Sequence, residues 1–226
     1  MKNTFSLLFI LNIIALTSCT NGQPEETLVY SNDFEGSSLV QKEFGSINYA
    51  YNTSEKWFKF DGNTVLGRFG LGGIIIELKD LPTHDYFIVE YDFYVHDNWE
   101  GNGLRGNGED VLIFNVDNTS IYFSSIINSK CIDQNCDTVQ SFPDVIKSRT
   151  NPENANVTNP NLPGVCYWKG EIGGSKKFHI KELIPHSSVS SNITIGADIK
   201  DAGSDLCFKS WSVDNIKVTT VRVIDL

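Results

Sequence analysis

Apolar and polar residues alternate along the middle of the chain. Between residues 86 and 95 nearly every position is β-branched or aromatic, and one side of a two-residue repeat is occupied by Phe87, Val89, Tyr91, Phe93 and Val95. Because successive side chains of a strand point to opposite faces, this pattern predicts a strand with one buried face.

Shorter runs of the same kind predict further strands. They cover residues 28–34, 64–69, 74–78, 114–116, 121–127, 176–183, 192–199 and 209–223. Turn residues such as those at 61–63 separate them, and no stretch has convincing helical periodicity. The pattern predicts an all-β fold, in which two antiparallel sheets pack as a β-sandwich and bury the apolar faces.

Two segments interrupt the strand pattern. Residues 96–110 form a glycine-rich loop with Trp99 and several carboxylates, and residues 128–174 are irregular and rich in proline and asparagine. Loops of such length in a compact domain are usually functional or disordered. We therefore expect residues 96–110 to form one wall of a binding site, and residues 128–174 to be an insertion braced by cysteines.

Length, composition and charge limit the number of domains and the class of partner. The chain has 226 residues, enough for a single β-sandwich domain, and 40% of them are hydrophobic, enough for a core. A charged content of 20% is too low for disorder. The net charge of −10 argues against nucleic acid or an anionic membrane surface as the main partner, and fits calcium or a neutral polymer better.

The N-terminus has the features of an export signal. Lys2 precedes an apolar run over residues 5–16, which is too short for an ordinary membrane span. The sequence Leu16-Thr17-Ser18-Cys19 follows and resembles a bacterial lipoprotein box, in which cleavage precedes a cysteine that becomes lipidated. The resemblance implies a signal peptide over residues 1–18, a tether over 19–26 and a β-sandwich over 27–223. It also implies a cell-envelope protein, outer-membrane anchored and contacting the membrane only through lipid on Cys19; an ordinary cleaved signal peptide is the alternative.

Four cysteines remain in the exported part of the chain. We expect Cys131 to pair with Cys136 across a polar loop, and Cys166 to pair with Cys207. The second bridge closes a loop long enough to contribute roughly 3–4 kcal/mol in the chain-entropy model. A zinc site with four cysteine ligands is the competing interpretation.

Two short stretches carry a resemblance to a known fold. Residues 32–36 (Asn-Asp-Phe-Glu-Gly) and residues 210–218 resemble the first and last strands of secreted jelly-roll modules, which include concanavalin A-like lectins and calcium-containing carbohydrate-binding modules. The resemblance implies that these strands lie side by side. It also implies a structural calcium ion held by Asp33 or Glu35 together with Asp214, with carboxylate oxygens that suit a hard cation. A simple turn at Asp214 is the alternative.

A glycan site needs an aromatic platform and nearby polar groups. The two long loops supply aromatic candidates in Trp99, Tyr167 and Trp168, and the polar candidates are Asp97, Asn98, Glu100, Asn102 and Asp110. Against this, tryptophans often cap the core of a sandwich, as we expect of Trp57 and Trp211.

Catalytic motifs are weak. The glycosidases that share the jelly-roll fold place acids at alternating positions of one strand, whereas Glu90 and Asp92 supply only two such acids here. No Gly-x-Ser-x-Gly or His-Glu-x-x-His sequence occurs, and the histidines at 84, 96, 179 and 186 are scattered. We therefore expect non-catalytic binding of a polysaccharide or glycan, with a protein-binding adhesion or assembly module second and a glycoside hydrolase third.

Overall fold

The computed structural model describes residues 23–36, 45–50, 57–102, 108–130, 139–146, 150–200 and 206–224. The predicted signal peptide, its lipidation site Cys19, and the pair Cys131 and Cys136 lie outside the described residues. No helix able to cross a membrane occurs within the described ranges.

The larger of the two main sheets has seven strands in the order β11-β12-β6-β14-β4-β3, with β1 also paired to β14. The strands are β1 (Glu25–Asn32), β3 (Trp57–Phe60), β4 (Asn63–Phe69), β6 (Tyr86–Asp97), β11 (Val157–Pro163), β12 (Ile172–Pro185) and β14 (Lys209–Arg222). All its strand pairs are antiparallel. The pairing of β1 with β14 confirms the expectation that the first and last strands lie side by side.

The smaller main sheet has five antiparallel strands in the order β2-β5-β13-β7-β8. They are β2 (Gly45–Ala50), β5 (Gly72–Leu78), β7 (Val111–Val116), β8 (Thr119–Ser125) and β13 (Ser191–Asp198). A separate two-stranded sheet pairs β9 (Val139–Gln140) with β10 (Asn151–Pro152). The expected insertion over 128–174 is therefore partly ordered as short strands.

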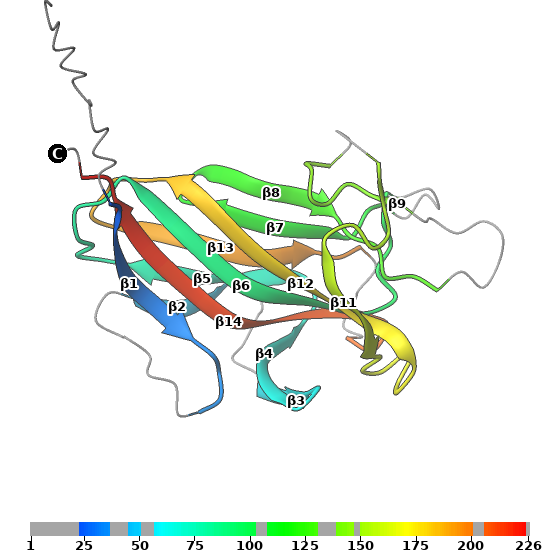
Figure 1. Ribbon diagram of the computed structural model, residues 1–226. Helices are drawn as coiled ribbons and strands as arrows, with labels where there is room; N and C mark the ends of the chain where they lie inside the picture. The colour runs from blue at the N-terminus through cyan, green and yellow to red at the C-terminus, as the bar shows by residue number, and fades with distance from the viewer. Residues whose placement is uncertain are drawn as a thin grey trace, which may run out of the picture.

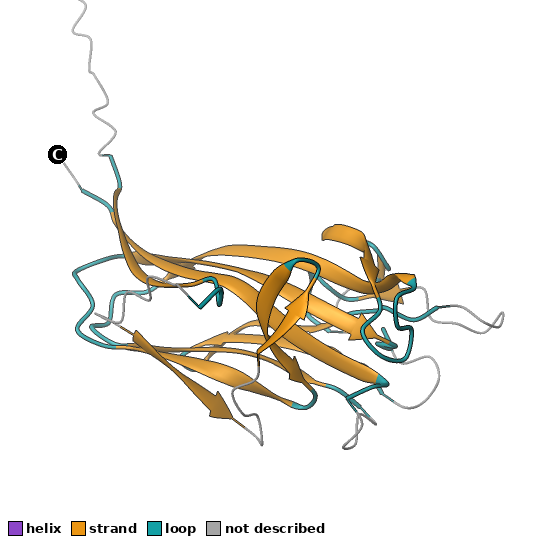
Figure 2. Cartoon of the chain, turned by 90° about the horizontal axis from the view of Figure 1, so that it is seen from below, coloured by secondary structure: helices purple, strands orange, loops and turns teal. Residues whose placement is uncertain are grey.

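The two main sheets pack face to face as a β-sandwich, which confirms the predicted all-β fold (Figures 1 and 2). The alternating face of β6 lies in the core as its pattern predicted, and Tyr91 meets Phe114 of the opposite sheet with ring centroids 5.3 Å apart. The C-terminus and the start of β1 lie at one end of the sandwich, and β9 and β11 lie at the other (Figure 1). The predicted tether therefore leads into the end of the sandwich opposite β9 and β11.

A second, smaller core covers part of the outer face of the seven-stranded sheet. It is formed by Phe60, Val65, Tyr94 and Leu162, from strands β3, β4, β6 and β11. His96 is buried next to it, 4.8 Å from Phe60 by ring centroids, and contacts two serine hydroxyls. Burial, with a smaller contribution from Arg68, lowers the pKa of His96 to about 3. His96 is thus a neutral core residue of β6 and does not belong to a loop as the sequence suggested.

Candidate functional site

A groove of about 480 Å³ lies on the outer face of the five-stranded sheet. Residues from β5, β7, β13 and the segments beside them line it: Leu71, Gly72, Gly73, Ile75, Ile113, Asn115, Thr194, Gly196, Ala197 and Asp198. No residue of this set was expected to bind ligand from the sequence.

Two glycines create the floor of the groove. Gly73 of β5 and Gly196 of β13 are directly paired across the ladder. A Cβ atom on Gly73 would lie 2.7 Å from the Ile195 carbonyl oxygen, and one on Gly196 would lie 2.6 Å from that of Gly72. The two strands therefore approach too closely for a side chain at either position, and the floor is bare backbone.

Side chains of neighbouring strands line the groove in register. Ile75, Thr194 and Asn115 occupy adjacent positions on β5, β13 and β7, so they form one row across the sheet. Gly73 and Gly196 form a second row across the sheet, which continues through Ile113 of β7 to Phe123 of β8. Phe123 is 41% exposed. The groove consequently combines apolar contact surface with a few hydroxyl and amide groups, a composition typical of small-molecule and sugar sites.

The groove carries little net charge. Asp198 is the single ionisable residue among those that line it within the described part of the chain. Its Oδ2 atom lies 2.6 Å from Nζ of Lys200. A carboxylate neutralised in this way does not select for a charged ligand, so the groove suits an uncharged one.

The predicted aromatic platform at Trp99 is wrong. Trp99 is fully buried and its Nε1 atom donates a hydrogen bond of 2.8 Å to the Ser210 carbonyl oxygen. Trp168 is also buried, with Lys130 placed 5.3 Å from its ring centroid. Of the three predicted aromatic residues, only Tyr167 is exposed, with 50% of its surface accessible, and its ring packs edge-on against Phe208. Both tryptophans instead pack the interior because their large apolar surfaces gain most from burial.

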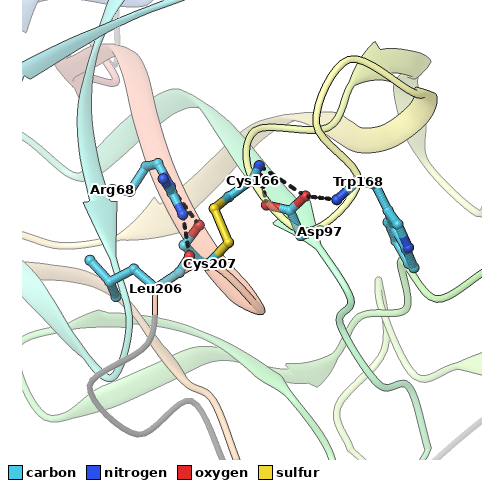
Figure 3. The surroundings of a disulfide bond; sticks show 7 residues. Arg68, Asp97, Cys166, Trp168, Leu206 and Cys207 are labelled. Atoms are coloured by element: carbon cyan, nitrogen blue, oxygen red, sulfur yellow. Dashed lines mark hydrogen bonds between the residues drawn. A yellow bond between two sulfur atoms is a disulfide. The ribbon is translucent and has the colours of Figure 1, made fainter.

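Asp97 holds the neighbouring loop in place and is not available to a ligand. Its buried carboxylate accepts hydrogen bonds from the backbone N–H groups of Trp168, at 3.0 Å, and Cys166, at 3.2 Å (Figure 3). Burial raises the pKa of Asp97, while these amide hydrogen bonds oppose the rise. Asp97 therefore has a structural role in place of the predicted ligand-binding one, because without its carboxylate these buried backbone N–H groups would lose their hydrogen-bond partner.

Asp110 has a similar structural role at the base of the glycine-rich loop. Its carboxylate, which is fully buried, accepts hydrogen bonds from the backbone N–H groups of Glu100, at 2.6 Å, and Lys200, at 2.8 Å. Nζ of Lys209, also buried, lies 3.0 Å from Oδ2. Burial raises the pKa of Asp110 to about 6, although the Lys209 cation acts in the opposite direction.

The remaining predicted polar ligands are also engaged within the protein. Asn98 accepts a hydrogen bond from the Ser129 hydroxyl, and Asn102 accepts one from the Ser125 hydroxyl. Glu100 lies 3.6 Å from Nζ of Lys209. The described part of the loop is therefore tied into the end of the sandwich, whereas the groove lies on the face of the five-stranded sheet.

The long-range disulfide is confirmed. Cys166 and Cys207 are bonded across 41 residues (Figure 3). The bridge joins the loop that follows β11 to the segment that precedes β14, and the N–H of Tyr167 donates to the Cys207 carbonyl oxygen at 3.1 Å. A disulfide between these two cysteines rules out their part in the competing zinc site.

The three predicted calcium ligands are held by protein groups. Glu35 accepts hydrogen bonds from Thr64 and lies 3.5 Å from Lys59. Asp33 is exposed and accepts a hydrogen bond of 3.2 Å from the backbone N–H of Glu35, and Asp214 accepts hydrogen bonds from Asn215. Within the described ranges, no group of three or more His, Cys, Asp or Glu side chains is placed to hold a metal ion. Calcium binding by Asp33, Glu35 and Asp214 stays a prediction.

Two carboxylates face each other across β6 and β14. Asp92 and Asp214 are direct partners in the ladder and both are buried. Burial raises the pKa of Asp92, but hydrogen bonds from Lys177 and His179, among others, outweigh it and leave the pKa lowered. Burial, with a smaller contribution from the Asp92 charge, raises the pKa of Asp214 to about 6. Lys177 and His179 lie 2.7 and 2.9 Å from the Asp92 carboxylate, so its oxygens are already paired within the protein.

The raised pKa of Asp214 has a measurable effect on stability. Its folded pKa of about 6 exceeds the reference value of 3.8, so the folded state binds more protons between those values and loses stability as the pH rises through them. We expect the free energy of unfolding of the wild type, relative to that of Asp214→Asn, to fall by up to about 3 kcal/mol between pH 4 and 7. Urea unfolding of both proteins across this range measures it. A difference that does not change with pH would contradict the assignment.

Comparison with known proteins yields likeness in fold only. No protein-family model matches the sequence, and no curated protein matches it. Among solved structures, the chain is similar to dimeric latent PorU from Porphyromonas gingivalis, with a TM-score of 0.41 and 7% identity over 90% of this chain and 14% of PorU. The chain therefore spans a small part of the length of PorU.

Two further solved structures are similar over nearly their whole length. A family 35 carbohydrate-binding module from Clostridium thermocellum gives a TM-score of 0.32 and 11% identity, over 86% of this chain and 97% of that module. The K3 cleaved adhesin domain of Lys-gingipain from Porphyromonas gingivalis w83 gives 0.38 and 8%, over 86% of this chain and 100% of that domain. Scores this low say nothing about which ligand this chain binds.

Proposed function

We propose that this protein is a non-catalytic binding protein of the bacterial cell envelope, which holds a neutral polysaccharide or glycan in the groove of the five-stranded sheet. The observation that carries the proposal is the groove itself, with its backbone floor and its mixed apolar and polar lining. A sugar ring offers C–H faces to residues such as Ile75 and Ile113, and hydroxyl groups to Asn115 and Thr194.

The lining chemistry supports binding without hydrolysis. Glycoside hydrolysis uses two carboxyl groups on either side of the scissile bond. Among the described residues that line the groove, Asp198 is the one carboxylate, and it is paired with Lys200. A ligand in the groove therefore meets one acid where the reaction requires two.

The proposed location rests on the N-terminal sequence. The lipoprotein box ending at Cys19 would anchor the protein through lipid, and the tether over residues 19–26 would lead into β1. Such an anchor would attach at the start of β1, a strand of the seven-stranded sheet, and would leave the groove on the outer face of the five-stranded sheet free to meet an extended polymer (Figure 1).

A protein-binding adhesion or assembly role is the second candidate. Apolar side chains are exposed near the disulfide, where Tyr167 is 50% exposed and Ile172 is 76% exposed. Exposed apolar surface of this kind is typical of protein contact sites. A partner protein would contact this end of the sandwich and leave the groove unaffected.

A single bulky substitution separates the two roles. Thr194→Trp places an indole in the groove, whereas Asn192→Trp places one on an exposed position of the same strand outside it. We expect the full-length mature protein to bind at least one neutral polysaccharide on an array, with Thr194→Trp lowering the affinity at least about tenfold and Asn192→Trp leaving it unchanged.

The controls of this experiment address the alternatives. Tyr167→Ala tests the disulfide end, and a repeat with chelator tests whether calcium contributes. A wild type that binds no neutral polysaccharide, or binding that Thr194→Trp leaves intact, would contradict the proposed site. Loss of binding in Tyr167→Ala alone would move the site to the other end of the sandwich.

A further inference from the structure

A charged pair lies at the edge of the groove, at the end of β13. Asp198 is the last residue of β13 and lines the groove, and Lys200 lies two residues further along the chain. Nζ of Lys200 is 2.6 Å from Oδ2 of Asp198, and their side chains are 42% and 31% exposed, respectively. Both are therefore open to a ligand while remaining in contact with each other.

We propose that Asp198 and Lys200 form the specificity pair of the groove and select neutral glycans that carry two free hydroxyl groups on adjacent carbon atoms. This inference rests on the proposed function and deepens it, because it states which class of sugar the groove accepts. A polymer whose linkages occupy one hydroxyl of each adjacent pair is bound less well.

The chemistry of the two side chains matches such a diol. An ionised carboxylate has acceptor capacity beyond its contact with Lys200, and a lysine ammonium has donors beyond its contact with Asp198. One hydroxyl can thus donate to Asp198 while its neighbour accepts from Lys200. Hydrogen bonds with one ionised partner are roughly twice as strong as those between neutral groups. The pair therefore discriminates more strongly than the amide and hydroxyl of Asn115 and Thr194.

The backbone around the pair is held in place. The N–H of Lys200 donates to Oδ1 of Asp110 at 2.8 Å, and Asp110 is in turn fixed by Lys209 and by the N–H of Glu100. Gly108 lies against the Lys200 side chain, where an added Cβ would approach Cγ to 3.1 Å. A pair whose backbone is fixed in advance loses little conformational entropy on binding.

The rest of the face offers a matched control. Glu77 and Lys79 also form an ion pair, with a distance of 3.8 Å, at the opposite end of β5 from the glycine floor. Neither residue lines the groove. Neutralising this pair changes the charge of the protein as much as neutralising Asp198 and Lys200 does, without touching the groove.

The experiment compares affinities for defined neutral probes. These are cellohexaose, dextran and yeast mannan, which contain adjacent hydroxyls, each intact and after periodate oxidation and borohydride reduction. Laminarihexaose is added, because its C3 linkages remove the adjacency from interior residues. We expect the full-length mature protein to bind at least one intact probe at least about tenfold more tightly than its oxidised form and than laminarihexaose.

The variants assign this preference to the pair. Asp198→Asn and Lys200→Met should each weaken binding of the intact probe about tenfold and remove the preference over the oxidised form. Glu77→Gln and Lys79→Met, each made alone, should change neither. The inference would be overturned by any of three results. The wild type could bind intact and oxidised probes equally, it could bind none of them, or the preference could survive in Asp198→Asn. If Thr194→Trp abolishes binding while Asp198→Asn leaves the preference intact, the groove stands as the binding site and only the specificity pair fails.

Discussion

Replacing Lys209 with methionine is expected to lower the free energy of unfolding by about 3 kcal/mol or more at pH 7.5. Lys209 and Asp110 are both fully or almost fully buried, and their charged groups lie 3.0 Å apart. The substitution leaves a buried carboxylate with only backbone N–H groups as partners, and an unpaired buried charge is far more costly than the intact pair is favourable. Urea unfolding at constant pH measures the loss.

The pH dependence of that loss distinguishes charge from packing. With Lys209 present, burial already raises the pKa of Asp110 to about 6. Without the Lys209 cation the pKa of Asp110 rises further, so the folded variant binds a proton more readily. Its loss in free energy of unfolding relative to the wild type should therefore shrink as the pH falls from 7.5 to 5. Adding Asp110→Asn to Lys209→Met removes the remaining charge and should restore much of the lost stability. A deficit below about 1 kcal/mol, or one that is equal at both pH values, would show that the pair is not a buried ion pair.

Removing the disulfide is expected to have an effect of similar size. Replacing Cys166 and Cys207 together with alanine should lower the free energy of unfolding by about 3–4 kcal/mol, because the bridge closes a loop with a sequence separation of 41 residues. The loop after β11 should also become more accessible to protease near Tyr167, since it loses its covalent tie to the segment before β14. Urea unfolding under non-reducing conditions and limited proteolysis measure the two effects.

The other pair of cysteines gives a matched control. The predicted bridge between Cys131 and Cys136 would enclose a much shorter segment, so replacement of this pair by alanine should cost less stability in the same model. Equal costs for both pairs, or a change below about 1 kcal/mol for Cys166 and Cys207, would mean that loop closure is not what this bridge contributes.

The fold was predictable because its signals are local. The two-residue repeat over 86–95 identified the buried face of β6, and runs of β-branched residues marked β5, β13 and β14. The pairing of β1 with β14 was predicted only through the resemblance of their sequences to jelly-roll modules. The alternation and the β-branched runs concern one strand each, and the resemblance concerns the two ends of the domain. None of these signals requires knowledge of the order of the other strands in the sheet.

The site was not predictable because it depends on strand order. Gly73 and Gly196 are 123 positions apart, and they meet only because β5 and β13 are neighbours in the sheet. A glycine inside a strand pattern indicates close approach of another backbone. This signal was present at Gly196, inside the predicted strand 192–199, whereas Gly73 precedes the predicted strand 74–78. In the same way, His84 and His186 appear unrelated in the sequence, yet their ring nitrogens lie 2.7 Å apart.

The loop was misinterpreted because its residues have structural uses that composition does not show. A tryptophan and several carboxylates between strands are typical of a ligand site, and they also suit a buried loop. Trp99 fills the interior and Asp97 accepts hydrogen bonds from backbone N–H groups that would otherwise be unpaired. Only the burial of each side chain distinguishes these roles, and burial depends on the whole fold.

Locating a bound oligosaccharide on the protein tests most directly whether the groove of the five-stranded sheet is the binding site. Titration of the ¹⁵N-labelled mature protein with cellohexaose, followed by amide chemical shifts, reports which strands contact the oligosaccharide. We expect the largest shifts at Gly73, Ile113, Thr194 and Gly196, on the outer face of the five-stranded sheet. Shifts confined to the segment around Tyr167 and Cys207, with the groove amides unchanged, would contradict this expectation.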